Sequence, residues 1–136
     1  MKQAYDPRQL MISFGQHVPR AFPDGTFISV ERHGDGVRKV VGACGSVARS
    51  VDPDNTATVK LTVRWDSDTA KWAQRMYDMD NETGQGTFSV LIKDLRGGLV
   101  FFAEAAWVAQ APNDEFGVEM GDMEITIETG EATWNR

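Results

Sequence analysis

The segment Thr58–Trp65 (TVKLTVRW) alternates strictly between polar and apolar residues. Successive side chains of an extended chain point to opposite faces, so this period of two over eight residues predicts a half-buried antiparallel β-strand. The abundance of Val and Thr favours the same conformation. The apolar face, which we expect in the core, consists of Val59, Leu61, Val63 and Trp65. The polar face consists of Thr58, Lys60, Thr62 and Arg64.

The same alternation returns near the end of the chain, in residues 123–128 (MEITIE). Ile125 and Ile127 are predicted to enter the core. The opposite face consists of Glu124, Thr126 and Glu128. It is therefore acidic, whereas the polar face of the first strand carries two basic residues.

Two longer apolar runs, Thr87–Leu95 and Leu99–Val108, flank Arg96-Gly97-Gly98. Two strands joined by a Gly-Gly turn are typical of a β-hairpin, and we expect Trp107 in the core. Pro112 ends the second run, because proline cannot donate to a strand ladder. Shorter strands are predicted at Leu10–Phe14 and Thr26–Val30.

A single helix is predicted at about residues 67–80. Asp66-Ser67-Asp68 supplies N-cap side chains, and Trp72 and Met76 belong to an apolar stripe at helical spacing that we expect in the core. Asn81–Gly84 is suited to a left-handed exit from the helix. The fold class is therefore mainly β: an antiparallel sandwich or barrel-like protomer with one peripheral helix.

The chain has 136 residues, of which 41% are hydrophobic, and a net charge of −6. This length suits one domain, residues 1–136. No run approaches the roughly 18 apolar residues of a membrane helix, and the N-terminus lacks the apolar core of a signal peptide. The single cysteine, Cys44, excludes an internal disulfide. A net acidic chain disfavours sequence-specific DNA binding.

The two halves of the chain differ in charge. Residues 1–75 contain 11 Lys/Arg and 8 Asp/Glu, a net +3, whereas residues 76–136 contain 3 and 12, a net −9. Such an asymmetry is compatible with a solvated acidic surface, with self-association, or with a single-sign surface that must not adhere to an acidic polymer.

Residues 31–54 contain four interspersed glycines and a basic pair at Arg38-Lys39. The segment is either a long hairpin arm or a mobile loop. Loops beyond about 12–15 residues are uncommon in compact domains and usually carry function.

Motifs with chemistry are absent. No glycine-rich phosphate loop occurs, and His17, His33 and Cys44 lack the spacing of a zinc site or a Cys/His dyad. Glu124 and Glu128 share a face about 13 Å apart, at about 3.3 Å per residue, which is too far for a glycosidase pair. Asp52-Pro-Asp54-Asn55 lacks the later residues of a calcium loop. We therefore expect neither an enzyme, nor a cofactor, nor a metal.

Short segments in order along almost the whole chain resemble the tail tube proteins of contractile-tailed bacteriophages. The segment that carries most of the resemblance is Phe22–Arg32 (FPDGTFISVER). The others are Tyr5-Asp6-Pro7, Lys39–Ala43 (KVVGA), Gly45–Ser50 (GSVARS), Thr58–Thr62, Val90–Leu95, Ala105–Val108 (AAWV) and Thr129-Gly130. Cys44 departs from the small polar or acidic residue expected there.

The resemblance implies six protomers in a ring whose strands form one β-barrel around a lumen. Rings would stack into a tube, in a virion assembled in the bacterial cytoplasm. The implied partners are further copies of the chain, the tail sheath, the tape measure protein and baseplate or terminator proteins, with DNA passing without specific binding. Alternatives are another ring-forming component (a tail terminator, a baseplate hub or a secretion-system tube) or a monomeric binding module.

Two hypotheses about sites follow. Residues 31–54 form an arm between subunits or rings that meets acidic residues of a neighbour through Arg32, Arg38, Lys39 and Arg49. Residues expected to face the lumen are Glu124, Thr126, Glu128, Thr58 and Thr62. The basic alternation of Lys60 and Arg64 argues against a uniformly acidic lumen, so either both strands contribute to the lumen wall or one of them faces the sheath.

Overall fold

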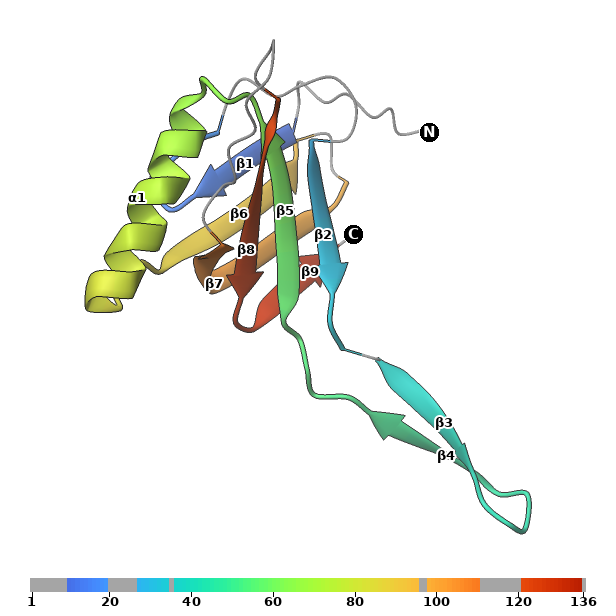
Figure 1. Cartoon of the computed structure of the whole chain (residues 1–136). Coiled ribbons are helices and arrows are strands. Elements are labelled where there is room, and N and C mark those ends of the chain that lie inside the picture. Colours follow the sequence, from blue (N-terminus) through green and yellow to red (C-terminus); the bar gives the residue numbers. More distant parts are fainter. Residues whose placement is uncertain (1–9, 20–26, 35, 96–97, 111–120, 136) are drawn as a thin grey trace.

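The computed structural model describes residues 10–19, 27–34, 36–95, 98–110 and 121–135. It is mainly β, with one helix and a single antiparallel sheet that curls into a half-barrel (Figure 1). The predicted fold class is confirmed. A two-stranded hairpin extends from one end of this body (Figure 1).

Six strands form the path of the sheet, in the order β1-β6-β7-β8-β5-β2, with every pair antiparallel. Their bounds are β1 Leu10–Phe14, β2 Ile28–Arg32, β5 Ala57–Val63, β6 Phe88–Asp94, β7 Val100–Gln110 and β8 Met123–Thr129. The predicted hairpin of β6 and β7 is confirmed, although residues 96–97 of its turn lie outside the described residues.

A further strand, β9 (Ala132–Asn135), has no counterpart in the sequence predictions. It pairs with β7 from Ala103↔Ala132 onward, in the same register as the Ala106↔Thr129 pair of β7 and β8. The amide of Gly130 donates to the carbonyl of Ala105 at 2.9 Å. The strands β8 and β9 therefore follow one edge of β7, separated only by a bend at Gly130 and Glu131.

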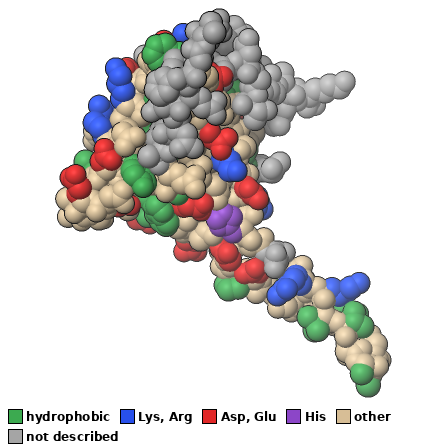
Figure 2. Space-filling model, viewed as in Figure 1, with side chains coloured by type: hydrophobic (Ala, Val, Ile, Leu, Met, Phe, Trp, Pro, Cys, Tyr) green, Lys and Arg blue, Asp and Glu red, His purple; other side chains and the backbone are tan. Residues whose placement is uncertain are grey.

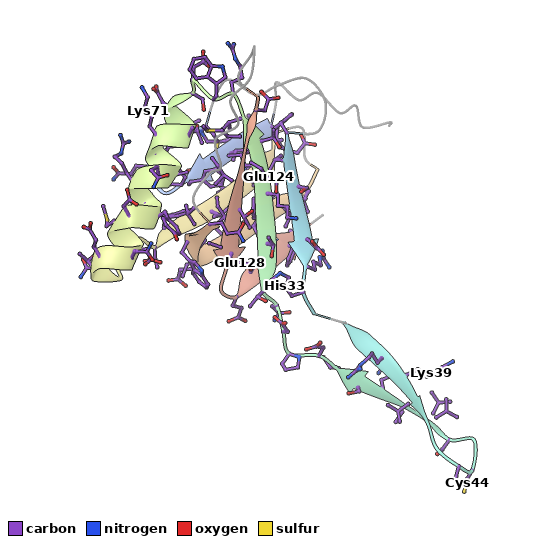
Figure 3. All side chains as sticks on the ribbon, viewed as in Figure 1. His33, Lys39, Cys44, Lys71, Glu124 and Glu128 are labelled. Atoms are coloured by element: carbon purple, nitrogen blue, oxygen red, sulfur yellow. The ribbon has the colours of Figure 1, made fainter. Side chains whose placement is uncertain are left out.

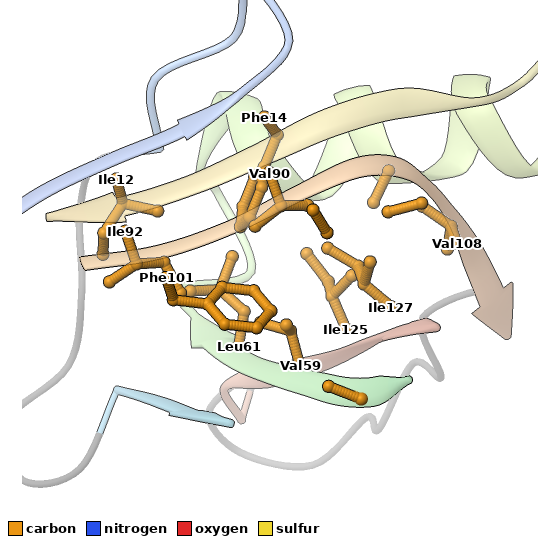
Figure 4. Packing of buried hydrophobic residues seen from close by; sticks show 14 of the residues in the cluster. Ile12, Phe14, Val59, Leu61, Val90, Ile92, Phe101, Val108, Ile125 and Ile127 are labelled. Atoms are coloured by element: carbon orange, nitrogen blue, oxygen red, sulfur yellow. The ribbon is translucent and has the colours of Figure 1, made fainter. Parts of the chain in front are cut away.

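The core fills the inside of the curled sheet (Figure 4). Its fully buried side chains come from strands on opposite parts of the curl, such as Leu61 of β5 and Phe101 of β7. Five strand residues predicted in the core are confirmed: Val59, Leu61, Val63, Ile125 and Ile127.

Two tryptophans that were predicted in the core do not lie there. Trp65 is 48% exposed, because β5 ends at Val63 and Trp65 lies in the turn that leads to the helix. Trp107 is only half-buried, because Ala106 and Val108 occupy the inward positions of β7 beside its register shift.

Helix α1 spans Asp68–Thr83, three residues beyond the predicted end. The Ser67 hydroxyl caps it by accepting from the Ala70 amide at 3.3 Å, and the chain leaves the helix only at Gly84, where φ is 72°. Trp72 is buried and stacks on Phe14, with ring centroids 5.5 Å apart. Met76 is partly buried against the core. Within the described part of the chain, no helix is both long and apolar enough to cross a bilayer.

The segment between β2 and β5 forms a hairpin rather than a loop. Its strands, β3 (Val37–Val41) and β4 (Val47–Val51), pair with each other, and every residue of both is exposed. A tight turn joins them, in which the Gly42 amide donates to the Ser46 carbonyl at 2.8 Å and Gly45 has a φ of 82°. We call the segment Gly36–Asp52 the arm.

Candidate assembly surfaces

Strands β2, β5 and β8 present one continuous polar surface on the side away from the core. Because β5 and β8 pair in register, Thr58 lies opposite Glu128, Lys60 opposite Thr126, and Thr62 opposite Glu124. On the other side of β5, Glu31 lies opposite Thr58 and Ser29 opposite Lys60. The polar sides of the two strands thus form a single surface, which we call the polar face (Figure 3).

The polar face is mixed in charge and acidic on balance. Glu31, Glu124 and Lys60 are exposed, while Thr62, Thr126 and Glu128 are half-buried. A hollow of about 220 Å³ beside β2 is lined by residues that include Ser29, Lys60 and Glu124. Lys60 therefore lies among carboxylates rather than on a separate basic surface.

Thr58 is not an exposed member of this face, contrary to the prediction, because it is buried within a hydrogen-bond network. Its hydroxyl donates to Oε1 of Glu128 at 2.9 Å, and its oxygen also contacts Nε2 of His33. Nδ1 of His33 lies 3.1 Å from Oγ1 of Thr56, whose hydroxyl donates to Asp54 at 2.6 Å. This last bond is the main reason that the pKa of Asp54 lies below its ordinary value.

Both hydroxyl protons of this network are directed to carboxylates, and each hydroxyl oxygen also contacts one ring nitrogen of His33. The second carboxylate oxygen of Glu128 lies 3.8 Å from Nε2 of His33. His33 follows β2 at the base of the arm (Figure 3). The network therefore connects the segment that leads into the arm with β5 and β8.

The four basic residues predicted for the arm do not form one cluster. Lys39 and Arg49 lie directly opposite each other across the hairpin. Arg38 is opposite Ser50 and, by alternation, on the other face of the hairpin. Arg32 belongs to β2, where its guanidinium carbon lies 4.1 Å from the ring centroid of Trp134. Only Lys39 and Arg49 therefore share a face of the arm.

The two histidines and the cysteine do not come together in one site. His17 stacks on Trp72 at 4.8 Å and bonds Oγ1 of Thr69 through Nε2 at 2.9 Å. Burial, together with the charge of Arg75, lowers its pKa below 6.5. Cys44 lies at the tip of the arm and His33 at its base (Figure 3). Among the described residues, no three His, Cys, Asp or Glu side chains group as metal ligands do.

A hollow of about 530 Å³ lies beside the start of α1, lined by residues that include His17, Asp66 and Thr69. The His17 imidazole uses its Nε2 on Thr69 and its ring face on Trp72, so its role is to pack this corner of the body. The sequence predictions also missed His33 as a structural residue. Its only signal was its place directly before the glycine-rich segment.

A phage structural protein is a relative of this chain over most of its length. The chain is 25% identical over 138 aligned residues to Structural protein ORF10 of Pseudomonas phage KPP10, covering 96% of this chain and 80% of that protein. No family model matches the chain.

Solved structures share the fold. A chain of the tube-terminating cap of the anti-feeding prophage superimposes with a TM-score of 0.61 at 10% identity, covering 99% of this chain and 93% of that one. A chain of the PVC sheath/tube terminator, from an extracellular contractile injection system, gives 0.61 at 9% identity and 99% coverage of both chains. A chain of the PVC sheath-tube complex gives 0.59 at 11% identity, covering 97% and 91%. The resemblance to phage tail-tube-family proteins is thereby confirmed.

Proposed function

We propose that this chain is a structural protein of the inner tail tube of a contractile-tailed phage, in which rings of six copies stack around a channel for DNA. The proposal combines a phage structural protein as relative with the fold of tube-terminating assemblies. The role is one of assembly, without catalysis or a cofactor, in the virion tail.

The arm is the observation that carries this proposal. A two-stranded hairpin is marginally stable alone in water, yet this one projects from the body with five exposed valines (Figure 2). They are Val37, Val40, Val41, Val47 and Val51. Burying them against another protein removes apolar surface from water and stabilises the hairpin. The arm is thus suited to join subunits or rings.

The sheet also supports self-association. Its path ends at β1 and β2, and strands at the end of a sheet offer backbone groups to a further strand. Neighbouring copies that continue the sheet around a ring would cover such edges and produce a common barrel.

We place the polar face, with Glu124, Thr126, Glu128 and Thr62, toward the channel. A wet, acidic wall disfavours adhesion of phosphates, so DNA passes without specific binding. The tape measure protein would occupy the same channel before ejection. The sheath would surround the tube, and baseplate or terminator proteins would contact its ends.

A tail terminator is the second candidate, because two of the structures that share the fold are a tube-terminating cap and a sheath/tube terminator. A terminator also forms rings, but its assembly stops at a single ring, whereas a tube protein forms open-ended stacks.

Electron microscopy of the purified protein in negative stain, over a series of rising concentrations, separates these roles. Stacked rings of constant diameter are the expected result. Isolated rings that do not stack favour the terminator. Monomers at every concentration contradict both roles and favour a binding module.

A further inference from the structure

We propose that the arm of one copy docks on the outer face of β7 and β9 of a second copy, with Lys39 and Arg49 against Glu104 and Glu131. The inference rests on the proposed self-assembly and names the surface that receives the arm. It starts from two pairs of residues, one basic and one acidic, and in each pair the fold places two like charges side by side.

The first pair lies on the arm. Lys39 and Arg49 are exposed and directly opposite each other, and in the described part of the chain neither forms a hydrogen bond or an ion pair. Like charges in this position destabilise a strand pair. The same face of the hairpin carries Val37 opposite Val51 on one side of the charges and Val41 opposite Val47 on the other.

The second pair lies on the body. Glu104 of β7 follows Ala103, and Glu131, in the bend before β9, precedes Ala132, so the register of the Ala103↔Ala132 pair places the two opposite each other. Both are exposed, whereas Ala103 and Ala132 are buried, so the two carboxylates leave the sheet on its outer side. No hydrogen bond or ion pair reaches either of them from the residues that the structure describes.

An exposed aromatic ring adjoins these carboxylates. Phe102 is 43% exposed and lies opposite Thr133 on the same outer side. On the other side of the carboxylates, the chain positions are held by Ala105 and Gly130. The surface thus offers an apolar side chain, then a negative pair, then two small residues.

The distance from the charged pair to the neighbouring apolar side chain agrees between the two surfaces on one side. Two residues along a strand cover about 6.6 Å at about 3.3 Å per residue. This step separates the basic pair from each valine pair on the arm, and it also separates Glu104 from Phe102. When the charges meet, one valine pair therefore covers Phe102. Burial of these apolar groups adds to the attraction between the charges.

Other acidic residues are less suited to the basic pair. Asp78 accepts a hydrogen bond from Gln74, and Asp80 accepts one from the Gly86 amide. Asp66 forms an ion pair with Arg64, and Glu128 accepts a hydrogen bond from the Thr58 hydroxyl. Glu124 lies opposite Thr62 and contributes a single charge. The arm points away from its own body (Figure 1), so the acceptor belongs to another copy.

Charge reversal tests the contact, with assembly followed by sedimentation and negative-stain microscopy and folding followed by circular dichroism. Lys39→Glu/Arg49→Glu and Glu104→Lys/Glu131→Lys are each expected to fold and to raise the concentration needed for assembly more than tenfold. The chain with all four changes is expected to assemble again, and so is a mixture of the two double variants. Asp78→Lys/Glu82→Lys, which makes the same charge change on exposed residues of α1, is the control and is expected to assemble as the wild type does.

The outcomes separate this inference from the proposed function. A wild-type chain that never assembles contradicts both. If the arm variant fails but Glu104→Lys/Glu131→Lys assembles normally, the arm is an assembly element and this acceptor surface is wrong. Folded double variants that the four-fold change does not rescue also overturn the docking.

Discussion

The hydroxyl of Thr58 donates a 2.9 Å hydrogen bond to Glu128 across the β5–β8 pair. The bond brings a side chain from a face with basic residues against a side chain from an acidic strand. As a result, Thr58 is only 7% exposed, and the hydroxyl oxygen remains available to His33. A polar residue on the outer side of a sheet is therefore a structural residue here.

Replacing Thr58 by Val is expected to lower the free energy of unfolding by about 1–2 kcal/mol, because Glu128 and His33 each lose a partner while both keep some access to water. Thr62→Val on the same strand is the matched control, since in the described residues the Thr62 hydroxyl has no hydrogen bond, and we expect a change below about 0.5 kcal/mol. Urea unfolding measures both, and equal values for the two variants would exclude the network as a stabilising element.

Trp65 and Trp72, on either side of the start of α1, should differ strongly in how much they contribute to the free energy of unfolding. Trp72→Ala removes a buried ring that contacts Phe14, Phe88 and His17, and we expect a loss of about 3–5 kcal/mol. Trp65→Ala removes a half-exposed ring and should cost less than about 1.5 kcal/mol. Thermal or urea unfolding distinguishes them, and a larger loss for Trp65 would contradict the placement of that residue in the turn.

The pKa of His17 predicts a pH dependence of stability. Burial lowers that pKa in the folded chain below 6.5, so on acidification the unfolded chain binds a proton before the folded chain does. The contribution of His17 is therefore present above pH 6.5 and is lost as pH falls toward the folded-state pKa. Between pH 7.5 and 5, His17→Gln is expected to lose less stability than the wild type. Parallel curves for the two proteins would contradict the prediction.

The arm valines should matter for assembly and not for folding of the body. Val41→Ser/Val47→Ser changes two side chains that are 58% and 63% exposed, so the free energy of unfolding is expected to change by less than about 0.5 kcal/mol. Assembly should need a higher protein concentration, because less apolar surface is buried between copies. Sedimentation at several concentrations measures this. Unchanged assembly would mean that the arm face is not buried in the assembled state.

Much of the fold could be predicted because the signals are local. Alternation placed β5 and β8, and the aliphatic core positions of these two strands followed from the same period. Two apolar runs on either side of a Gly-Gly turn placed the β6–β7 pair, and Ser67 marked the start of α1. The end of α1 was less certain, because Asn81–Thr83 tolerate a helix and only Gly84 adopts the left-handed conformation that ends it. Strand β9 escaped prediction because four residues are too few to show a period.

The sequence by itself determined which residues extend, which coil and which aliphatic side chains avoid water, since these depend on neighbours within a few positions. The tertiary structure alone decided that Thr58 is buried, that Trp65 is exposed, and that Lys39 meets Arg49 on one face of the arm. It also placed Glu104 next to Glu131. Each of these facts depends on where a strand ends or on its register against a partner strand, and a shift of one residue would send the same side chains to opposite faces.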